Sequence, residues 1–180
     1  MKKVLIGLFV LLALLVGGIA LLPGEYEVKR SRVVAATPAE VYAAVLDLHT
    51  WPSWSVWSSE ADPDCVWNYN DKVGVGASNE WNGPELGKGG LTVTASEENT
   101  KIDYDLFFVE GDDRMESQGR FEFVPSGDGT EVTWVMHGEF EGFLKLFGLL
   151  MDSMVGPDFE EGLTGLDNFL QKPDSASESN

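Results

Sequence analysis

Residues 101–139 read KIDYDLFFVEGDDRMESQGRFEFVPSGDGTEVTWVMHGE and contain the clearest secondary-structure pattern in the chain. Within Lys101–Val109, apolar and polar side chains alternate, as in a strand with one buried face. Glu116–Val124 and Glu131–Glu139 repeat that alternation. Short stretches rich in Gly, Asp and Glu separate the three segments, and such turns join neighbouring antiparallel strands. The pattern therefore predicts an antiparallel meander.

Further strands are predicted on the N-terminal side of this meander. They are Glu25–Ala35, Val66–Tyr69, Val75–Trp81 and Gly90–Ser96. A sheet of seven strands twists strongly and curls, so its apolar concave face needs a cover. We therefore expect an α+β fold in which the curved sheet grips a helix, an arrangement that leaves space for a cavity between the two.

Two helical regions are predicted beside the sheet. Thr37-Pro38-Ala39-Glu40 has the composition of a capping box with proline in the first turn, and Pro52 is expected to end the helix that follows. A second helical region begins near Phe143. Gly156-Pro157 is expected to divide it and to open a long C-terminal helix that covers the sheet. Residues 173–180 are expected to form a disordered acidic tail.

The N-terminus, residues 1–24, has the composition of a membrane anchor. Val4–Leu22 is a run of 19 residues without a charge, and it follows Lys2 and Lys3. As a helix it would be about 28 Å long, close to the hydrocarbon thickness of a bilayer. The lysines favour a cytoplasmic N-terminus, which places the domain of residues 25–172 outside the cytoplasm. A cleaved signal peptide is the alternative, and both readings export the domain.

The charge balance and the cysteine count exclude several classes of function. Twelve Lys and Arg residues stand against 30 Asp and Glu residues, for a net charge of −18. Such a chain is repelled by nucleic acid and by anionic lipid headgroups, so no nucleic-acid partner is expected. Cys65 is the single cysteine, which rules out an internal disulfide and a cysteine-based metal site. No cofactor or metal is predicted.

Four stretches resemble the START-related SRPBCC superfamily, in particular its polyketide cyclase/dehydrase and lipid-transport branch. They are Ala36–Val41, Asp47–Trp54, Val73–Ala77 with the residues up to Gly89, and Gly129–Trp134. The resemblance covers most of Glu25 to Gln171. It implies a helix-grip fold with a hydrophobic pocket, and it implies no particular reaction, because members of this branch share no catalytic motif.

Aromatic and other apolar residues on the inward phase of the strands and helices form the predicted pocket wall. They are Trp51, Trp54, Trp57, Trp81, Tyr104, Phe108, Phe121, Phe123, Trp134, Met136, Phe159 and Leu163. In an open grip these side chains would line a cavity, whereas in a filled core they would simply pack together. The sequence leaves both alternatives open.

Few polar residues suit catalysis, and no catalytic residue is predicted. His49 is expected to cap the first helix, and His137 is expected to face solvent. Glu80 is expected outside the pocket, and Arg114 is expected in a surface ion pair. Neither histidine is accompanied by the residues of a catalytic triad or a zinc site.

Three functions remain compatible with this sequence. The first is a membrane-tethered binding module outside the cytoplasm for a lipid or another hydrophobic small molecule. The second is a cyclase- or dehydratase-like enzyme, which needs an ionisable group inside the pocket. The third is an envelope interaction domain with a filled core. The volume and the polar lining of the pocket discriminate between them.

Overall fold

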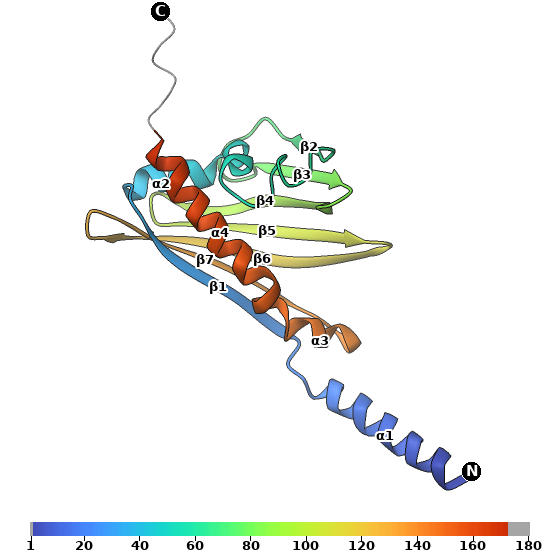
Figure 1. Cartoon of the computed structure of the whole chain (residues 1–180). Coiled ribbons are helices and arrows are strands. Elements are labelled where there is room, and N and C mark those ends of the chain that lie inside the picture. The colour runs from blue at the N-terminus through green and yellow to red at the C-terminus, as the bar shows by residue number, and fades with distance from the viewer. Residues whose placement is uncertain (1, 173–180) are drawn as a thin grey trace, which may run out of the picture.

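The computed structural model describes residues 2–172, and its central element is a seven-stranded antiparallel sheet of order β1-β7-β6-β5-β4-β3-β2 (Figure 1). Strands β2 to β6 are each paired with the next strand along the chain. β1 pairs with β7, from Glu25 opposite Glu139 to Val34 opposite Thr130. The strands are β1 (Glu25–Val34), β2 (Val66–Tyr69), β3 (Ser78–Gly83), β4 (Gly87–Glu97), β5 (Lys101–Glu110), β6 (Asp113–Ser126) and β7 (Gly129–Glu139).

The predicted meander is confirmed, with shifts at the strand ends. β3 begins at Ser78 instead of Val75. Gly74 and Gly76 have φ angles of 87° and 84°, and the amide of Ala77 donates a hydrogen bond of 2.8 Å to the carbonyl of Gly74. Positive φ angles suit glycine and turns, not strands. These two glycines therefore form a turn immediately before β3.

Helix α2 (Pro38–Leu46) begins with the predicted capping box. The amide of Glu40 donates to Thr37 Oγ1 at 3.4 Å, and the amide of Thr37 donates to Glu40 Oε2 at 2.8 Å. Each side chain satisfies a backbone N–H that the helix leaves free. The Thr37 hydroxyl also donates to Glu40 Oε2 at 2.7 Å, and this bond and the one from the Thr37 amide lower the pKa of Glu40.

The expected end of α2 at Pro52 is wrong. α2 ends at Leu46, and the 3-10 helix η1 (Leu48–Ser53) contains Pro52. His49 does not cap the helix, because Thr50 Oγ1 donates to the carbonyl of Ala44 at 2.5 Å and the indole of Trp51 donates to that of Val45 at 2.9 Å. These bonds satisfy the free carbonyls of the last turn and fold η1 back over α2.

The C-terminal cover helix is continuous through Gly156-Pro157, contrary to expectation. The 3-10 helix η2 (Gly142–Leu144) and the short helix α3 (Lys145–Gly148) precede α4 (Met151–Gln171), which contains Pro157 in its second turn. Proline normally pushes the preceding residue out of the helical region through a clash with its Cβ. Gly156 has no Cβ, so the helix continues and loses only the hydrogen bond that Pro157 cannot donate.

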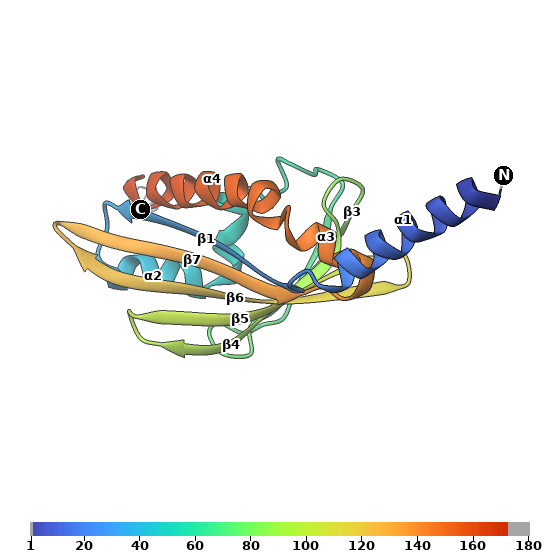
Figure 2. The ribbon, with the colours of Figure 1, turned by 90° about the horizontal axis from the view of Figure 1, so that it is seen from below.

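Both α2 and α4 lie on the concave face of the sheet, and α4 runs alongside β1 (Figures 1 and 2). The core lies between these helices and the sheet. Trp134, Phe121 and Phe159 are its largest fully buried side chains. The predicted curved sheet around a C-terminal helix is therefore confirmed.

Helix α1 (Lys2–Ala20) extends away from the domain (Figure 2). In the part of the chain that the structure describes, no helix meets the length and hydropathy criteria for a membrane-crossing segment. The anchor predicted for residues 1–24 stays a prediction. The acidic tail predicted for residues 173–180 lies outside the described residues.

Candidate functional site

An apolar cavity of about 90 Å³ lies between the concave face of the sheet and the N-terminal half of α4. Strands β2, β3, β4, β5 and β7, the segment from Trp51 to Trp57 and the helix α4 contribute residues to it. Its walls are formed by Trp51, Pro52, Ser55, Trp57, Trp67, Asn79, Trp81, Leu91, Tyr104, Leu106, Phe108, Trp134, Met136, Met151, Val155 and Phe159.

Most of the residues predicted for the pocket wall lie at this cavity. These are Trp51, Trp57, Trp81, Tyr104, Phe108, Trp134, Met136 and Phe159. Trp54, Phe121, Phe123 and Leu163 are buried in the core but do not line the cavity. Ligand contact by any of these residues stays a prediction.

Aromatic side chains fill much of the space under α4. The ring of Trp134 stacks on that of Phe159 with centroids 4.0 Å apart, and on that of Phe121 at 4.6 Å. Ligand pockets for drug-sized molecules have volumes of roughly 300–1,000 Å³. A cavity of about 90 Å³ is much smaller and has room for a small group only, so its volume alone favours the filled-core alternative.

Three polar atoms in the cavity walls have no hydrogen-bond partner. They are the indole nitrogens of Trp67 and Trp81 and the Oδ1 atom of Asn79. Asn79 is 5% exposed and Trp81 is 7% exposed. A buried polar atom without a partner costs about 1–3 kcal/mol, so each one calls for an explanation, such as a bound molecule.

The local sequence explains why these polar side chains lie in the wall. Asn79 and Trp81 are two residues apart on β3 and therefore share the inward face of the sheet. The ring of Trp81 occupies the space that a side chain at Gly89 would take, and it lies 5.9 Å from the ring of Trp67. Asn79 and Trp67 were not among the predicted pocket residues. The phase of Asn79 with Trp81 was the signal that could have identified it.

Tyr104 contributes a hydroxyl group to the centre of the wall. The indole of Trp134 donates a hydrogen bond of 2.7 Å to this hydroxyl. Burial raises the pKa of Tyr104, and the hydrogen bond from Trp134 lowers it by a smaller amount. The hydroxyl is therefore protonated at neutral pH, so it can donate a hydrogen bond but cannot act as a base.

The lining carries no formal charge. Among the described residues that form the cavity, none is an Asp, Glu, Lys, Arg or His. Burying an ionised ligand group without an opposite charge is very unfavourable. The walls therefore suit a neutral molecule with at least one hydrogen-bonding oxygen atom.

Ion pairs at the edge of the sheet position α4 over this cavity. Arg30 on β1 donates to Asp152 at 2.7 Å and to Glu160 at 2.6 Å, on either side of Gly156. A Cβ atom at residue 156 would clash with the Arg30 guanidinium, so glycine is required for this close approach.

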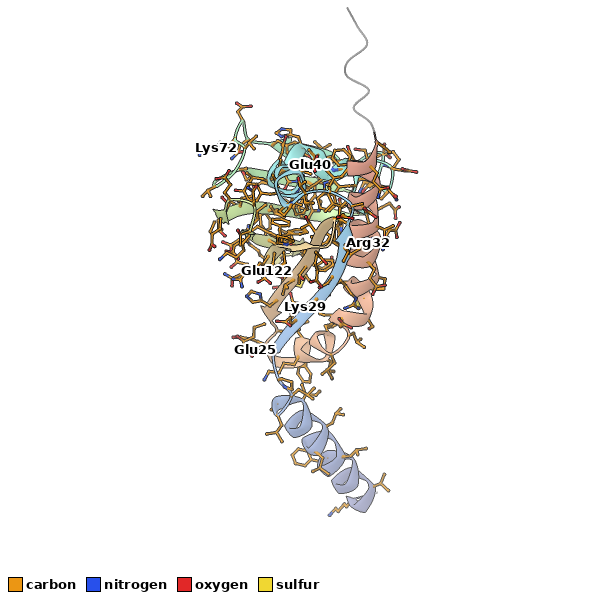
Figure 3. The ribbon with its side chains drawn as sticks, turned by 90° about the vertical axis from the view of Figure 1, so that its left-hand side faces the viewer. Glu25, Lys29, Arg32, Glu40, Lys72 and Glu122 are labelled. Carbon is orange, nitrogen blue, oxygen red and sulfur yellow. The ribbon has the colours of Figure 1, made fainter. Side chains whose placement is uncertain are left out.

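A second attachment lies near the C-terminal end of α4. Asp167 accepts a hydrogen bond of 2.9 Å from the amide of Ala35 and lies 3.8 Å from Arg32. Figure 3 shows Arg32 where β1 runs beside α4. α4 is thus attached to β1 from its first turn, at Asp152, to Asp167 near its C-terminal end.

The larger hollow of the molecule, about 1200 Å³, lies on the outer face of the sheet. Charged side chains such as Asp105, Arg120, Glu122 and His137 line it, and it is widely open to solvent. Figure 3 shows Lys29 and Glu122 on this face. A wide, charged surface leaves a small ligand solvated, so the smaller apolar cavity is the better candidate site.

The remaining polar candidates lie outside the cavity. His137 is exposed, as predicted, and its Nε2 atom lies 3.1 Å from Gln118 Oε1. Glu80 is also exposed, and Arg114 pairs with Glu116 at 3.1 Å as predicted. His49 lies 3.0 Å from Asp47 and stacks on Tyr69.

Asp62 is a fully buried carboxylate that serves the fold. Its Oδ2 atom accepts hydrogen bonds of 2.9 Å from the amides of Glu85 and Leu86, which hold the β3–β4 turn. Among the residues that the structure describes, no group of three or more His, Cys, Asp or Glu side chains could hold a metal ion.

Comparison with known proteins identifies the family. The model of the family "Polyketide cyclase / dehydrase and lipid transport" matches residues 25–170. The chain belongs to this family. The comparison with curated proteins found no match.

Solved structures share the fold of this member of the family. A protein from Chromobacterium violaceum is 16% identical with a TM-score of 0.61, and the alignment covers 82% of this chain and 98% of that one. A protein from Rhodobacter sphaeroides is 22% identical with a TM-score of 0.56, over 81% and 91%. Ara h 8.0201 is 13% identical with a TM-score of 0.59, over 82% and 98%. At these identities the likeness shows the fold alone.

Proposed function

We propose that this family member is a membrane-tethered binding module, outside the cytoplasm, for a neutral hydrophobic small molecule. The observation that carries the proposal is the composition of the cavity between the sheet and α4. Its walls are apolar and aromatic, and the wall residues Trp67, Trp81 and Asn79 each have a buried polar atom without a hydrogen-bond partner. A ligand with a hydroxyl or carbonyl oxygen would supply the missing hydrogen-bond partners.

Ligand entry requires the closed cavity to open. Met151 and Val155 form the wall contributed by the first turns of α4. Pro157 removes one backbone hydrogen bond from this part of the helix, whereas Arg30 holds the same turn to β1 through Asp152. We infer that the turn containing Met151 moves aside when the exposed Arg30–Asp152 ion pair breaks, and that it then admits a molecule larger than the present volume.

The membrane tether is supported by the composition and the isolation of α1. The run from Val4 to Leu22 has no charge. Phe9 on α1 is 71% exposed and Leu14 is 68% exposed, and neither belongs to the apolar core of the domain. Exposed apolar side chains along a whole helix favour contact with an apolar surface or phase. The length of the uncharged run matches the hydrocarbon thickness of a bilayer.

The cyclase- or dehydratase-like alternative has no specific observation in its favour. An acid–base catalyst needs a group in the cavity that changes protonation near neutral pH. Tyr104 is the ionisable side chain in the described lining, and burial moves its pKa further from neutrality. It could polarise a carbonyl group as a hydrogen-bond donor, but it could not remove a proton.

Fluorine NMR with three small probes tests the proposal. The probes are 4-fluorobenzyl alcohol, 4-fluorotoluene and 4-fluorobenzoate, which differ in the presence of a hydroxyl group and of a charge. The alcohol should bind about 3–10-fold more tightly than fluorotoluene, because one neutral hydrogen bond contributes about 0.5–1.5 kcal/mol. Fluorobenzoate should not bind.

The variant Asn79→Leu should abolish the preference for the alcohol while it preserves the binding of fluorotoluene. Glu80→Leu is the matched control, because Glu80 is the next residue on β3 and is exposed. Equal binding of the benzoate, or an unchanged preference in Asn79→Leu, would contradict the proposed ligand class. Binding of none of the three probes would favour the filled structural domain.

A further inference from the structure

The end of the domain next to α1 carries a cluster of exposed apolar side chains. We define the apolar end surface as Phe143, Leu146, Phe147, Leu149, Leu150 and Met154, on η2, α3, the residues after α3 and the first turn of α4. Phe143 is 66% exposed and Leu149 is 57% exposed. Contiguous apolar surface of this kind marks an interaction site for protein or membrane.

Two hydrogen bonds attach this surface to the point where the chain leaves α1. Lys145 Nζ donates to the carbonyl of Leu22 at 3.1 Å, and the amide of Phe140 donates to that of Gly24 at 2.9 Å. Figures 1 and 2 show α3 beside the end of α1 that adjoins the domain. The apolar end surface therefore lies at the level where a membrane-inserted α1 would emerge from the bilayer.

The charge distribution also suits a bilayer interface. Residues 142–151 contain no acidic residue, in a chain with 30 Asp and Glu residues, and Lys145 is their single charge. Apolar side chains beside a lysine are typical of segments that lie in the headgroup region, where the amine can reach water. The strongly acidic remainder of the domain would be repelled by anionic lipids, which favours a zwitterionic surface.

The same helical turn connects this surface to the cavity. Met151 and Val155 line the cavity, whereas Leu150 and Met154 on the same turns are exposed on the apolar end surface. Displacement of this turn would open the cavity toward whatever covers that surface.

We propose that the apolar end surface docks into the interface of the bilayer that holds α1, so that the cavity exchanges its ligand directly with the membrane. This inference rests on the proposed tether and goes beyond it, because a tethered domain could equally well stand clear of the lipid. A second copy of the chain is the competing occupant of this surface, and the experiment below separates the two.

Depth-dependent quenching tests the docking on the full chain in phosphatidylcholine vesicles. In a Cys65→Ser background, an environment-sensitive NBD label is attached at Phe147→Cys or, as the control, at Glu98→Cys. Glu98 is exposed in the β4–β5 turn, far from α1 (Figure 1). The label at 147 should emit at shorter wavelength than that at 98. Lipids with a spin label in the acyl chain should quench the label at 147 several-fold more than the label at 98. Aqueous iodide should quench the label at 147 several-fold less than the label at 98.

The docking and the tether fail in distinguishable ways. If the chain floats with the vesicles but the label at 147 is quenched by iodide and not by lipid, the docking is wrong and the tether stands. Protection of the label from both quenchers would assign the surface to a second copy and overturn the docking. If the chain does not float with the vesicles, the tether and the docking are both wrong. The lipid quenching should persist at high salt, because apolar contact is insensitive to screening.

Discussion

The indole ring of Trp134 on β7 stacks face to face on the phenyl ring of Phe159 on α4, with centroids 4.0 Å apart and an interplanar angle of 5°. This is the direct contact between the centre of the sheet and the helix that covers it. Gly162, one turn further along α4, allows the approach, because a Cβ atom there would lie 2.9 Å from Trp134 Cζ3. This stacking holds α4 against the sheet, and the two rings occupy space that would otherwise belong to the cavity.

The first prediction concerns this contact. Trp134→Phe removes part of the stacked ring and the hydrogen bond to Tyr104, so the free energy of unfolding should fall by about 1–3 kcal/mol. The same variant should bind 4-fluorobenzyl alcohol more weakly, since Trp134 lines the cavity. Urea denaturation and fluorine NMR measure the two effects. A loss of stability with unchanged probe binding would indicate that Trp134 is core packing only.

The second prediction concerns the packing of α4. Leu163 is 1% exposed and lies in the hydrophobic core. Leu163→Ala should lower the free energy of unfolding by about 2–5 kcal/mol, the usual cost of truncating a well-packed leucine. Glu161→Ala, at an exposed site on the same helix, should change it by less than about 0.5 kcal/mol. Equal effects of the two variants in urea denaturation would mean that α4 does not cover the sheet tightly.

The third prediction concerns the glycine under Arg30. Gly-to-Ala substitution in a helix normally stabilises it by about 1 kcal/mol. Gly156→Ala should instead destabilise the protein, because the new methyl group would occupy the space of the Arg30 guanidinium. The control Ser153→Ala adds no bulk at an exposed site of the same helix. A higher thermal midpoint for Gly156→Ala would show that Arg30 does not lie against the helix.

The fourth prediction concerns acid. The hydrogen bond from Arg30 lowers the pKa of Asp152, and those from Thr37 lower the pKa of Glu40. The folded pKa values lie below the unfolded values of about 4, so the folded state favours the ionised forms. Their contribution to stability is complete above about pH 4 and is lost as the pH falls through the folded values. Burial and the charge of Glu161 raise the pKa of Asp158, which opposes this trend.

Urea midpoints measured stepwise below neutral pH should therefore decrease in acid. Asp152→Asn and Glu40→Gln cannot titrate, so the double variant should show a shallower decrease than the unmodified chain. Parallel pH profiles for the two proteins would indicate that neither carboxylate is linked to folding.

Local sequence patterns predicted most of the fold. The capping box at Thr37 and Glu40 was predictable because its hydrogen bonds join residues three positions apart. The alternation in β5 placed Tyr104 and Phe108 on the inward face, where both line the cavity. The end of α2 was not predictable in this way, because Thr50 acts through a hydrogen bond that appears only in the folded chain. The continuity of α4 was open to local reasoning, since a glycine before Pro157 removes the clash that normally ends a helix.

The cavity itself was less accessible to sequence analysis. An inward-facing aromatic residue can fill a core or line a space, and the distinction depends on which side chains meet across the sheet. Phe121 and Phe123 pack beneath the surface of the wall, whereas Met151 and Val155 reach it from a turn that was expected to lie outside the cover helix. The lack of hydrogen-bond partners for the polar atoms of Trp67 and Asn79 depends on the residues packed around them, which the strand pattern does not reveal.

Methionine methyl NMR tests the central claim most directly, because the chain carries methionines inside and outside the cavity. Met136 and Met151 line it, whereas Met154 is exposed on α4. With ¹³C-methyl-labelled methionine, added 4-fluorobenzyl alcohol should shift the signals of Met136 and Met151 and leave that of Met154 unchanged. Shifts confined to Met154, or no shift at saturating probe, would contradict a binding site between the sheet and α4.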